Sequence, residues 1–174
     1  RRKLNCLNIK FSEKSLNSYE SNICESIKTV YGVDICPENI QEAKNRLHEE
    51  IMLNFRQNKK QPSLGFKSSI RYILDNNIIT GDSINKPDLI KFIDCGIETN
   101  KFDVIITNPP YQQSTNSHGA QAKPIYHLFV ELAIKLNPQY IVMITPSRWF
   151  TGGMGLSKFR EKMMSDKRIR SITD

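Results

Sequence analysis

The sequence has 174 residues, of which 39% are hydrophobic and 25% are charged. This predicts one soluble globular domain with a proper core, and no apolar run approaches the ~20 residues that a membrane-spanning helix needs. The formal net charge of +7 suits a polyanionic partner such as nucleic acid. A coding bias towards Lys, Asn and Ile explains the same charge equally well. The first residue is Arg1, so we expect the natural start to lie upstream.

The cysteines predict neither a disulfide scaffold nor a zinc site. Cys6, Cys24, Cys36 and Cys95 contain no Cys-x-x-Cys pair, and the three histidines stand at no ligand spacing from them. At this density we expect reduced thiols in a cytoplasmic protein. No signal peptide is visible at the start of the sequence.

The first predicted strand, Val30–Ile35, follows a short helix and leads through Pro37 into an amphipathic helix. Asp34 therefore stands at the tip of a strand, immediately before a helix. In dinucleotide-binding folds an acidic residue at this position binds the ribose hydroxyls. An Asp that caps the helix is the alternative, and both roles can hold together.

A second short strand is predicted after a polar stretch, 57–70, which we expect to be a surface loop. Residues 77–80 form the strand, and the turn Gly81-Asp82-Ser83 follows it. The turn is either a ligand-binding turn or an ordinary Asp turn. Residues 85–100 are expected to form a short helix and a loop.

The segment 101–112 combines a predicted strand with a proline-rich turn. Its apolar run, Phe102–Ile106, predicts a strand buried on both faces of a parallel sheet, and two prolines end that strand. Asn108 is then held at the carboxyl end of a central strand, where open α/β sheets bind ligands. The Asn108 side-chain oxygen and the Pro109 carbonyl could accept both hydrogens of a planar amine. Tyr111 offers a flat face for stacking, worth about 1–3 kcal/mol.

The remainder predicts further α/β alternation: a polar loop over 113–123, a helix over 124–136, a strand over 140–145, a helix over 156–166 and a strand over 169–173. The loop either closes over a substrate or is disordered. The whole pattern predicts a doubly wound, mostly parallel α/β sheet.

Several side chains in this part have two interpretations. Trp149 and Phe150 either shape a pocket beside Asn108 or pack in the core. His127 is either catalytic or, as we favour, a packed histidine. The basic residues of the last helix, such as Lys158 and Arg160, either meet phosphates or form a solvated face.

The sequence resembles a known family at four places. Asn-Pro-Pro-Tyr at 108–111 resembles the catalytic motif of S-adenosylmethionine-dependent amino-methyltransferases, chiefly the DNA adenine-N6 enzymes. Segments 31–35, 81–83 and 145–150 resemble that family's ribose, adenine and target-base segments. The resemblance implies catalytic roles for Asn108, Pro109, Pro110 and Tyr111, and cofactor binding by Asp34, Ile35, Asp82, Ser83 and Asn108.

The resemblance also implies a Rossmann-like methyltransferase fold, but one family motif is missing. The Asp-Pro-x-x-Gly-x-Gly loop, which cradles the methionine part of the cofactor, does not occur in the sequence. We therefore expect residues 1–174 to be a partial catalytic domain without its first strand and glycine-rich loop. We also expect no target-recognition domain in these residues.

The function implied is methyl transfer from S-adenosylmethionine to N6 of a flipped adenine in DNA. The order of the segments resembles that of fused restriction–modification enzymes, so a fused or separate endonuclease and recognition domain are expected partners. Glutamine-N5 methyltransferases of release factors and RNA amino-methyltransferases are alternatives, since a glutamine amide is also a planar amine. A truncated, non-catalytic nucleic-acid-binding remnant is a third.

Overall fold

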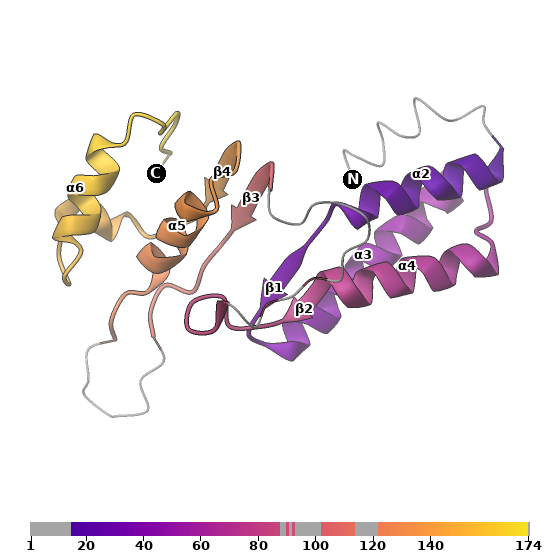
Figure 1. The fold of residues 1–174 in the computed structure, drawn as a ribbon, viewed down its shortest axis with the longest axis horizontal. Coiled ribbons are helices and arrows are strands. Elements are labelled where there is room, and N and C mark those ends of the chain that lie inside the picture. The colour runs from indigo at the N-terminus through magenta and orange to yellow at the C-terminus, as the bar shows by residue number, and fades with distance from the viewer. Residues whose placement is uncertain (1–14, 88–89, 91, 93–101, 114–121, 174) are drawn as a thin grey trace. The chain divides into compact units, whose positions relative to one another are not determined.

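The computed structural model describes residues 15–87, 90, 92, 102–113 and 122–173. The chain forms two compact units, residues 1–99 and residues 100–174, each with its own two-stranded sheet (Figure 1). Among the described residues, no helix combines the length and the apolar character needed to cross a membrane.

The described residues of the first unit form a parallel strand pair with three α-helices. Its elements are α2 (Leu16–Lys28), β1 (Gly32–Asp34), α3 (Pro37–Gln57), α4 (Leu64–Asn77) and β2 (Ile78–Thr80). β1 and β2 pair in parallel, with Asp34 opposite Thr80. The helical connection between two parallel strands is the arrangement that the sequence predicts for this region.

Aromatic side chains form the centre of the first unit's core. The rings of Tyr19 and Phe66 lie 5.1 and 4.9 Å from the Phe55 ring, measured between centroids. The Tyr19 hydroxyl donates a hydrogen bond to the buried side-chain carbonyl of Asn54. The buried Asn77 amide donates to the carbonyls that end α2 and precede β1, so it holds the end of α4 against the start of the sheet.

The expected loop over 57–70 is wrong in its second half. Helix α4 begins at Leu64, and the Ser63 hydroxyl caps it by accepting a hydrogen bond from the Phe66 amide at 3.1 Å. Phe66 and Ile70 are buried on one side of this helix. Their spacing of four residues was a helical signal, which the polar residues around it obscured.

The second unit contains a β-α-β segment followed by two short helices. Its elements are β3 (Val104–Thr107), α5 (Tyr126–Lys135), β4 (Tyr140–Met143), the 3-10 helix η2 (Ser147–Thr151) and α6 (Ser157–Ser165). β3 and β4 pair in parallel and in register from Val104 opposite Tyr140 to Thr107 opposite Met143. The buried core of this unit comprises Tyr126, Val130, Trp149, Leu156 and Phe159.

The prediction that the β3 strand is buried on both faces is wrong. Val104 and Ile106 are 49% and 76% exposed, and Tyr140 and Val142 on β4 are 59% and 55% exposed. Because the register is parallel, these four side chains share one face of the sheet. α5 contacts β4, and the described residues of this unit place no comparable layer over the exposed face.

The fold class is therefore α/β with short parallel strands, as predicted. The four described strands pair as two separate sheets, β1 with β2 and β3 with β4, and the single doubly wound sheet stays a prediction. The helix expected over 156–166 is confirmed as α6. The strand expected over 169–173 is absent, because no described segment pairs with it. Half of the helix expected over 86–93 lies outside the described residues.

Candidate cofactor pocket and catalytic turn

The predicted ribose and adenine segments meet at one edge of the first unit's sheet. Asp34 is the last residue of β1, and the Gly81-Asp82 turn directly follows β2. The Gly81 amide donates a hydrogen bond of 2.9 Å to the Asp34 carbonyl oxygen. Both aspartates therefore lie at the carboxyl ends of parallel strands, the edge where α/β sheets bind their ligands.

A cavity of about 380 Å³ opens at this edge of the first unit. Its lining residues are Ile35, Thr80, Gly81, Asp82, Lys86 and Ile90. A Cβ atom on Gly81 would lie 3.1 Å from the Ile90 Cγ1 and 3.3 Å from the Val33 Cγ1, so a larger residue would disturb this wall. Asp34 and Ser83, also predicted to bind the cofactor, do not line the cavity; Asp34 directly precedes the lining residue Ile35.

The Asp34 carboxylate is partly used by the protein itself. Its Oδ1 accepts a hydrogen bond from the Cys36 amide at 2.8 Å, and its Oδ2 accepts one from the Asn39 side chain at 3.2 Å. These bonds hold the turn that leads into α3. The prediction that Asp34 caps the helix is wrong, because Cys36 is the N-cap residue of α3 and no side chain forms a cap hydrogen bond there. An ionised carboxylate offers about four acceptor sites, so about two sites on Asp34 remain for a ligand.

The Asp82 carboxylate holds its own turn together. Oδ1 accepts from the amides of Ile84 and Asn85 at 3.1 and 2.9 Å, and Oδ2 accepts from the Asn85 side chain at 2.8 Å. The bonds from Asn85 lower the pKa of Asp82, which keeps the group ionised at neutral pH. About one acceptor site, on Oδ2, remains for a ligand.

The predicted catalytic turn follows β3 in the second unit. The Ile144 amide donates to the Thr107 carbonyl at 3.2 Å, which extends the ladder to the residue before Asn108. Asn108 is exposed, and its side chain makes no hydrogen bond within the described part of the chain. Pro109 is buried, whereas Pro110 is exposed and Tyr111 is 43% exposed. The Asn108 amide is therefore available to a ligand.

The catalytic turn is fastened to the start of α5. The Ile125 amide donates to the Tyr111 carbonyl at 3.2 Å. Gln112 and Pro124 form an isolated antiparallel bridge. Residues 114–121, predicted to be a loop that either closes over a substrate or is disordered, lie outside the described residues, so that prediction stays untested.

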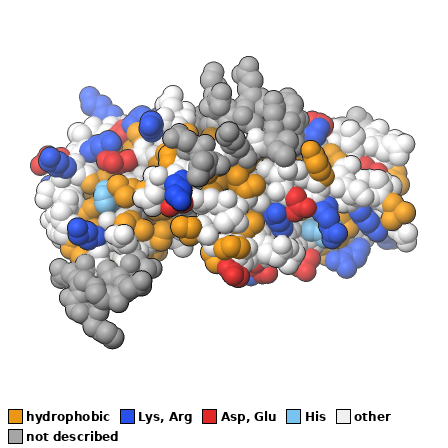
Figure 2. All heavy atoms as spheres, turned by 60° about the horizontal axis from the view of Figure 1, so that its bottom comes forward, with side chains coloured by type: hydrophobic (Ala, Val, Ile, Leu, Met, Phe, Trp, Pro, Cys, Tyr) orange, Lys and Arg blue, Asp and Glu red, His pale blue; other side chains and the backbone are white. Residues whose placement is uncertain are grey.

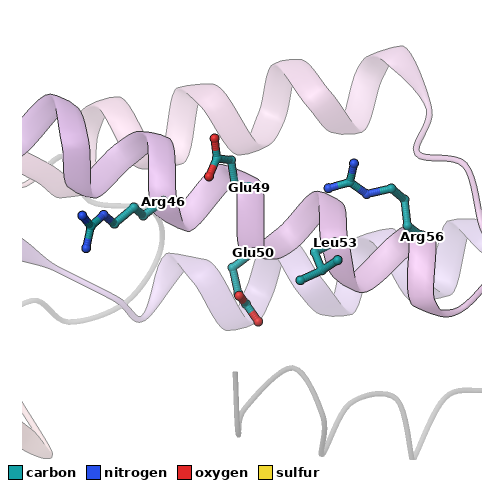
Figure 3. Close-up of a pocket in the computed structure, with 5 residues that line it drawn as sticks. All are labelled: Arg46, Glu49, Glu50, Leu53 and Arg56. Carbon is teal, nitrogen blue, oxygen red and sulfur yellow. The ribbon is translucent and has the colours of Figure 1, made fainter.

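A larger cavity, of about 560 Å³, lies along α3 in the first unit. Its lining residues are Arg46, Glu49, Glu50, Leu53 and Arg56, all on one helix. Figure 3 shows that these side chains leave the helix in different directions and do not converge on one point. This surface lacks the convergent polar groups that characterise a ligand site.

The sequence of the chain also matches the model of a known protein family. The model of the Eco57I restriction-modification methylase family matches residues 28–174. The chain belongs to this family. The match includes both strand pairs, the Asp34 and Asp82 edge and the Asn-Pro-Pro-Tyr turn, so the resemblance seen in the sequence is confirmed.

Two relatives of the Eco57I-family chain are longer proteins. An uncharacterized adenine-specific methylase of Mycoplasma pneumoniae is 37% identical over 92 residues, which cover 51% of this chain and 22% of that protein. The type II restriction enzyme and methyltransferase RM.Eco57I of Escherichia coli is 22% identical over 170 residues, covering 83% of this chain and 16% of that enzyme. The chain thus spans about a fifth of their length. No solved structure matches it.

Two ambiguous side chains of this Eco57I-family chain pack in the second unit's core. Trp149 is buried, and its ring stacks on Phe150 with 4.1 Å between centroids. The His127 ring lies 5.8 Å from the Phe159 ring, and its buried Nδ1 has no hydrogen-bond partner among the described residues. The structure therefore favours a core role for Trp149 and a packed role for His127.

Lys86 and Ile90 are pocket residues that the sequence did not predict. Two turns bring them to the cavity: the Lys86 amide donates to the Asp82 carbonyl, and the Ile90 amide to the Pro87 carbonyl, each at 3.1 Å. The segment was predicted to be a short helix over 86–93. Pro87 is compatible with the first turn of a helix, so no local signal marked Lys86 and Ile90 as pocket residues.

Proposed function

We propose that the protein containing this chain transfers a methyl group from S-adenosylmethionine to N6 of adenine in DNA, as the modification activity of a restriction–modification system. The observation that carries the proposal is the available Asn108 side chain at the carboxyl end of β3, within an Asn-Pro-Pro-Tyr turn of an Eco57I-family chain. The adenine-specific relative supports the choice of base.

The catalytic turn would bind the exocyclic amine of the target base. The Asn108 side-chain oxygen and the Pro109 carbonyl oxygen each accept one hydrogen of that amine, and Pro110 stiffens the turn. Tyr111 stacks on the base, which must leave the duplex at a cost of a few kcal/mol. Fixed acceptors and orientation supply most of the rate acceleration, because no general base is needed in the turn.

The cavity of the first unit suits the adenosine part of the cofactor. Asp34 has about two acceptor sites for a ribose diol, and Asp82 has about one for the adenine amine. Ile35 and Ile90 are apolar walls of the cavity, and the Ser83 backbone is a further candidate contact. S-adenosylmethionine, when bound, would supply the methyl group. The acceptors and the 380 Å³ volume fit its nucleoside half.

The proposal includes a Rossmann-like methyltransferase fold for this chain. Each parallel pair has its candidate site residues at its carboxyl edge, as expected for a Rossmann-like methyltransferase fold. We further propose that an endonuclease and a recognition domain, fused or separate, complete the system. The name of the E. coli relative combines a restriction enzyme with a methyltransferase.

The decisive experiment counts methyl groups transferred by the complete gene product. Radiolabelled S-adenosylmethionine is supplied with unmodified bacterial DNA, with RNA or with a release factor. Asn108→Ala should reduce transfer to DNA by about 10²–10³-fold or more, as loss of a positioned transition-state group does, with cofactor affinity within a few-fold of wild type. Gln139→Ala, an exposed polar change just before β4, should leave transfer unchanged. Normal turnover of Asn108→Ala would contradict the catalytic assignment, and transfer to RNA or release factor alone would contradict the substrate.

A further inference from the structure

Among the described residues, the positive charge is concentrated after β4. Residues 147–173 contain seven Lys and Arg but two Asp and Glu, a net charge of +5, whereas residues 15–87 have a net charge of zero. All seven basic side chains are exposed. In Figure 2 the charged side chains visible on the second unit are mostly Lys and Arg. This basic face comprises η2, the connector 152–156 and α6.

Part of the basic face has no acidic partner. Arg168 is neutralised by Asp166 through bonds of 2.9 and 2.7 Å, which hold the pKa of Asp166 at about 2. Lys162 pairs with Glu131 at 3.3 Å. Arg148, Lys158 and Arg160 form no ion pair in the described part of the chain. Unpaired charges of one sign on one face repel each other, and a polyanion relieves that repulsion.

Two of the unpaired side chains are held in place by the connector. Arg148 Nη1 donates to the Met154 sulfur at 3.3 Å, and Arg160 Nε donates to the Phe150 carbonyl at 2.7 Å. A Cβ atom on Gly152 would lie 3.5 Å from the Arg160 Cδ, so this side chain rests on the connector. The terminal nitrogens of Arg160 remain available. Arginine side chains that are already ordered lose less entropy when they bind a phosphate, and a guanidinium can donate two hydrogen bonds to it.

The basic face begins beside the catalytic turn of the same unit. Asn108 comes directly after β3, and Arg148 lies in η2, which comes after β4. Because the two strands are parallel and in register, both residues lie beyond the carboxyl edge of one sheet. Burial raises the pKa of Tyr126, and the charge of Arg148 acts against that rise, which places Arg148 near the start of α5. The residue before Tyr126 is bonded to the Tyr111 carbonyl.

We propose that Arg148 and Arg160 bind phosphates of the DNA strand next to the target adenine. The inference rests on the proposed function and adds a binding surface to it. A base can stay outside the duplex only if its backbone is held in a distorted path, and phosphate contacts supply that hold without reading sequence. Substituting these residues should reduce the salt dependence of DNA binding. Each phosphate that the protein neutralises contributes about 0.9 to the slope of log affinity against log salt concentration.

The test measures binding of the complete gene product to unmodified bacterial DNA over a series of salt concentrations. Arg148→Gln combined with Arg160→Gln should lower the slope of log affinity against log salt by about 2. The KM for DNA should rise, while cofactor affinity stays unchanged. Arg148→Lys with Arg160→Lys should retain most of the slope, because the charges remain. Lys135→Gln removes an exposed charge at the end of α5 and is the matched control.

The outcomes separate the inference from the proposed function. If wild type methylates DNA but the double Gln variant has the slope and KM of Lys135→Gln, the phosphate surface is wrong and the enzyme assignment stands. If the substitutions reduce binding to RNA or to anionic lipid vesicles and leave DNA binding intact, the assigned partner is wrong. If wild type transfers no methyl group to DNA, the proposed function fails first. A circular dichroism melt identical to wild type establishes that each variant is folded.

Discussion

A single carboxylate, Asp34, has bonds within the fold and acceptor sites that we propose for a ligand. It accepts hydrogen bonds from the Cys36 amide and the Asn39 side chain at the start of α3, and about two acceptor sites remain. These bonds orient the carboxylate next to Ile35, which lines the cavity, so a ligand would meet a group that is already oriented. This is the preorganisation that keeps the entropic cost of binding small.

The two roles of Asp34 can be separated by Asp34→Asn. Asparagine keeps a side-chain oxygen that can accept the hydrogen bond from the Cys36 amide, so α3 should remain intact and the melting temperature should change little. S-adenosylmethionine affinity should fall about 10-fold or more, because hydrogen bonds to a charged group contribute about 1.5–3 kcal/mol. Calorimetric titration of the complete gene product measures this loss.

The control for that change is Asp75→Asn. Asp75 is an exposed aspartate paired with Lys44 at 2.9 Å and does not line the cavity. Its substitution should leave cofactor affinity unchanged. If Asp34→Asn also binds the cofactor as wild type does, Asp34 serves α3 alone.

At the scale of elements, α2, α3 and α4 hold the first unit together and so fix the edge that carries both aspartates. Their shared core contains Phe55, which is fully buried between the Tyr19 and Phe66 rings. Neither strand of this unit exceeds three residues. The position of the cavity therefore depends on helix packing more than on the strand ladder.

Phe55→Ala tests that dependence. Removing a buried phenylalanine should lower the free energy of unfolding by about 3–5 kcal/mol. The protein loses the hydrophobic burial of the ring and gains a cavity, and both effects destabilise it. Urea unfolding followed by far-ultraviolet circular dichroism measures the change. Leu64→Ala, at a side chain that is 81% exposed, should stay within about 0.5 kcal/mol of wild type. A loss below about 1 kcal/mol for Phe55→Ala would show that the cluster is not the unit's main support.

The β3–β4 sheet leads to a different conclusion at the same scale. Its side chains are apolar on both faces, as in parallel sheets that are covered on each side, yet Ile106 is 76% exposed. The apolar pattern predicted a parallel strand correctly. It did not predict burial, because burial requires a second layer, and the described residues of this unit supply α5 on one face.

At the scale of the whole molecule, the two units differ in charge and in the chemistry they offer. Residues 100–174 contain ten Lys and Arg against five Asp and Glu, a net charge of +5, whereas residues 1–99 have a net charge of +2. The first unit has the carboxylates and the cavity that we propose for a nucleoside, and the second has the turn that we propose for a planar amine, together with the basic face. We propose that the first serves mainly the cofactor and the second mainly the nucleic acid.

This division predicts the ligand preference of the 174-residue chain. Its candidate pocket has groups for adenosine, and the sequence lacks the Asp-Pro-x-x-Gly-x-Gly loop for the methionine part. S-adenosylmethionine and 5′-methylthioadenosine should therefore bind with affinities within a few-fold of each other in calorimetric titrations. Asp34→Asn should weaken both. A preference of more than 100-fold for S-adenosylmethionine would show that other residues of this chain hold the methionine part.

The sequence by itself determined the α/β class, the parallel strand pairs and the family. It also placed Asp34, Asp82 and Asn108 at the carboxyl ends of strands, because hydrophobic runs and turn residues are local signals. The tertiary structure decided what locality cannot encode: that Lys86 and Ile90 line the cavity, that Trp149 is buried, and that one face of β3 is exposed. Burial and convergence depend on contacts between residues far apart in the chain, and no periodicity in the sequence records those contacts.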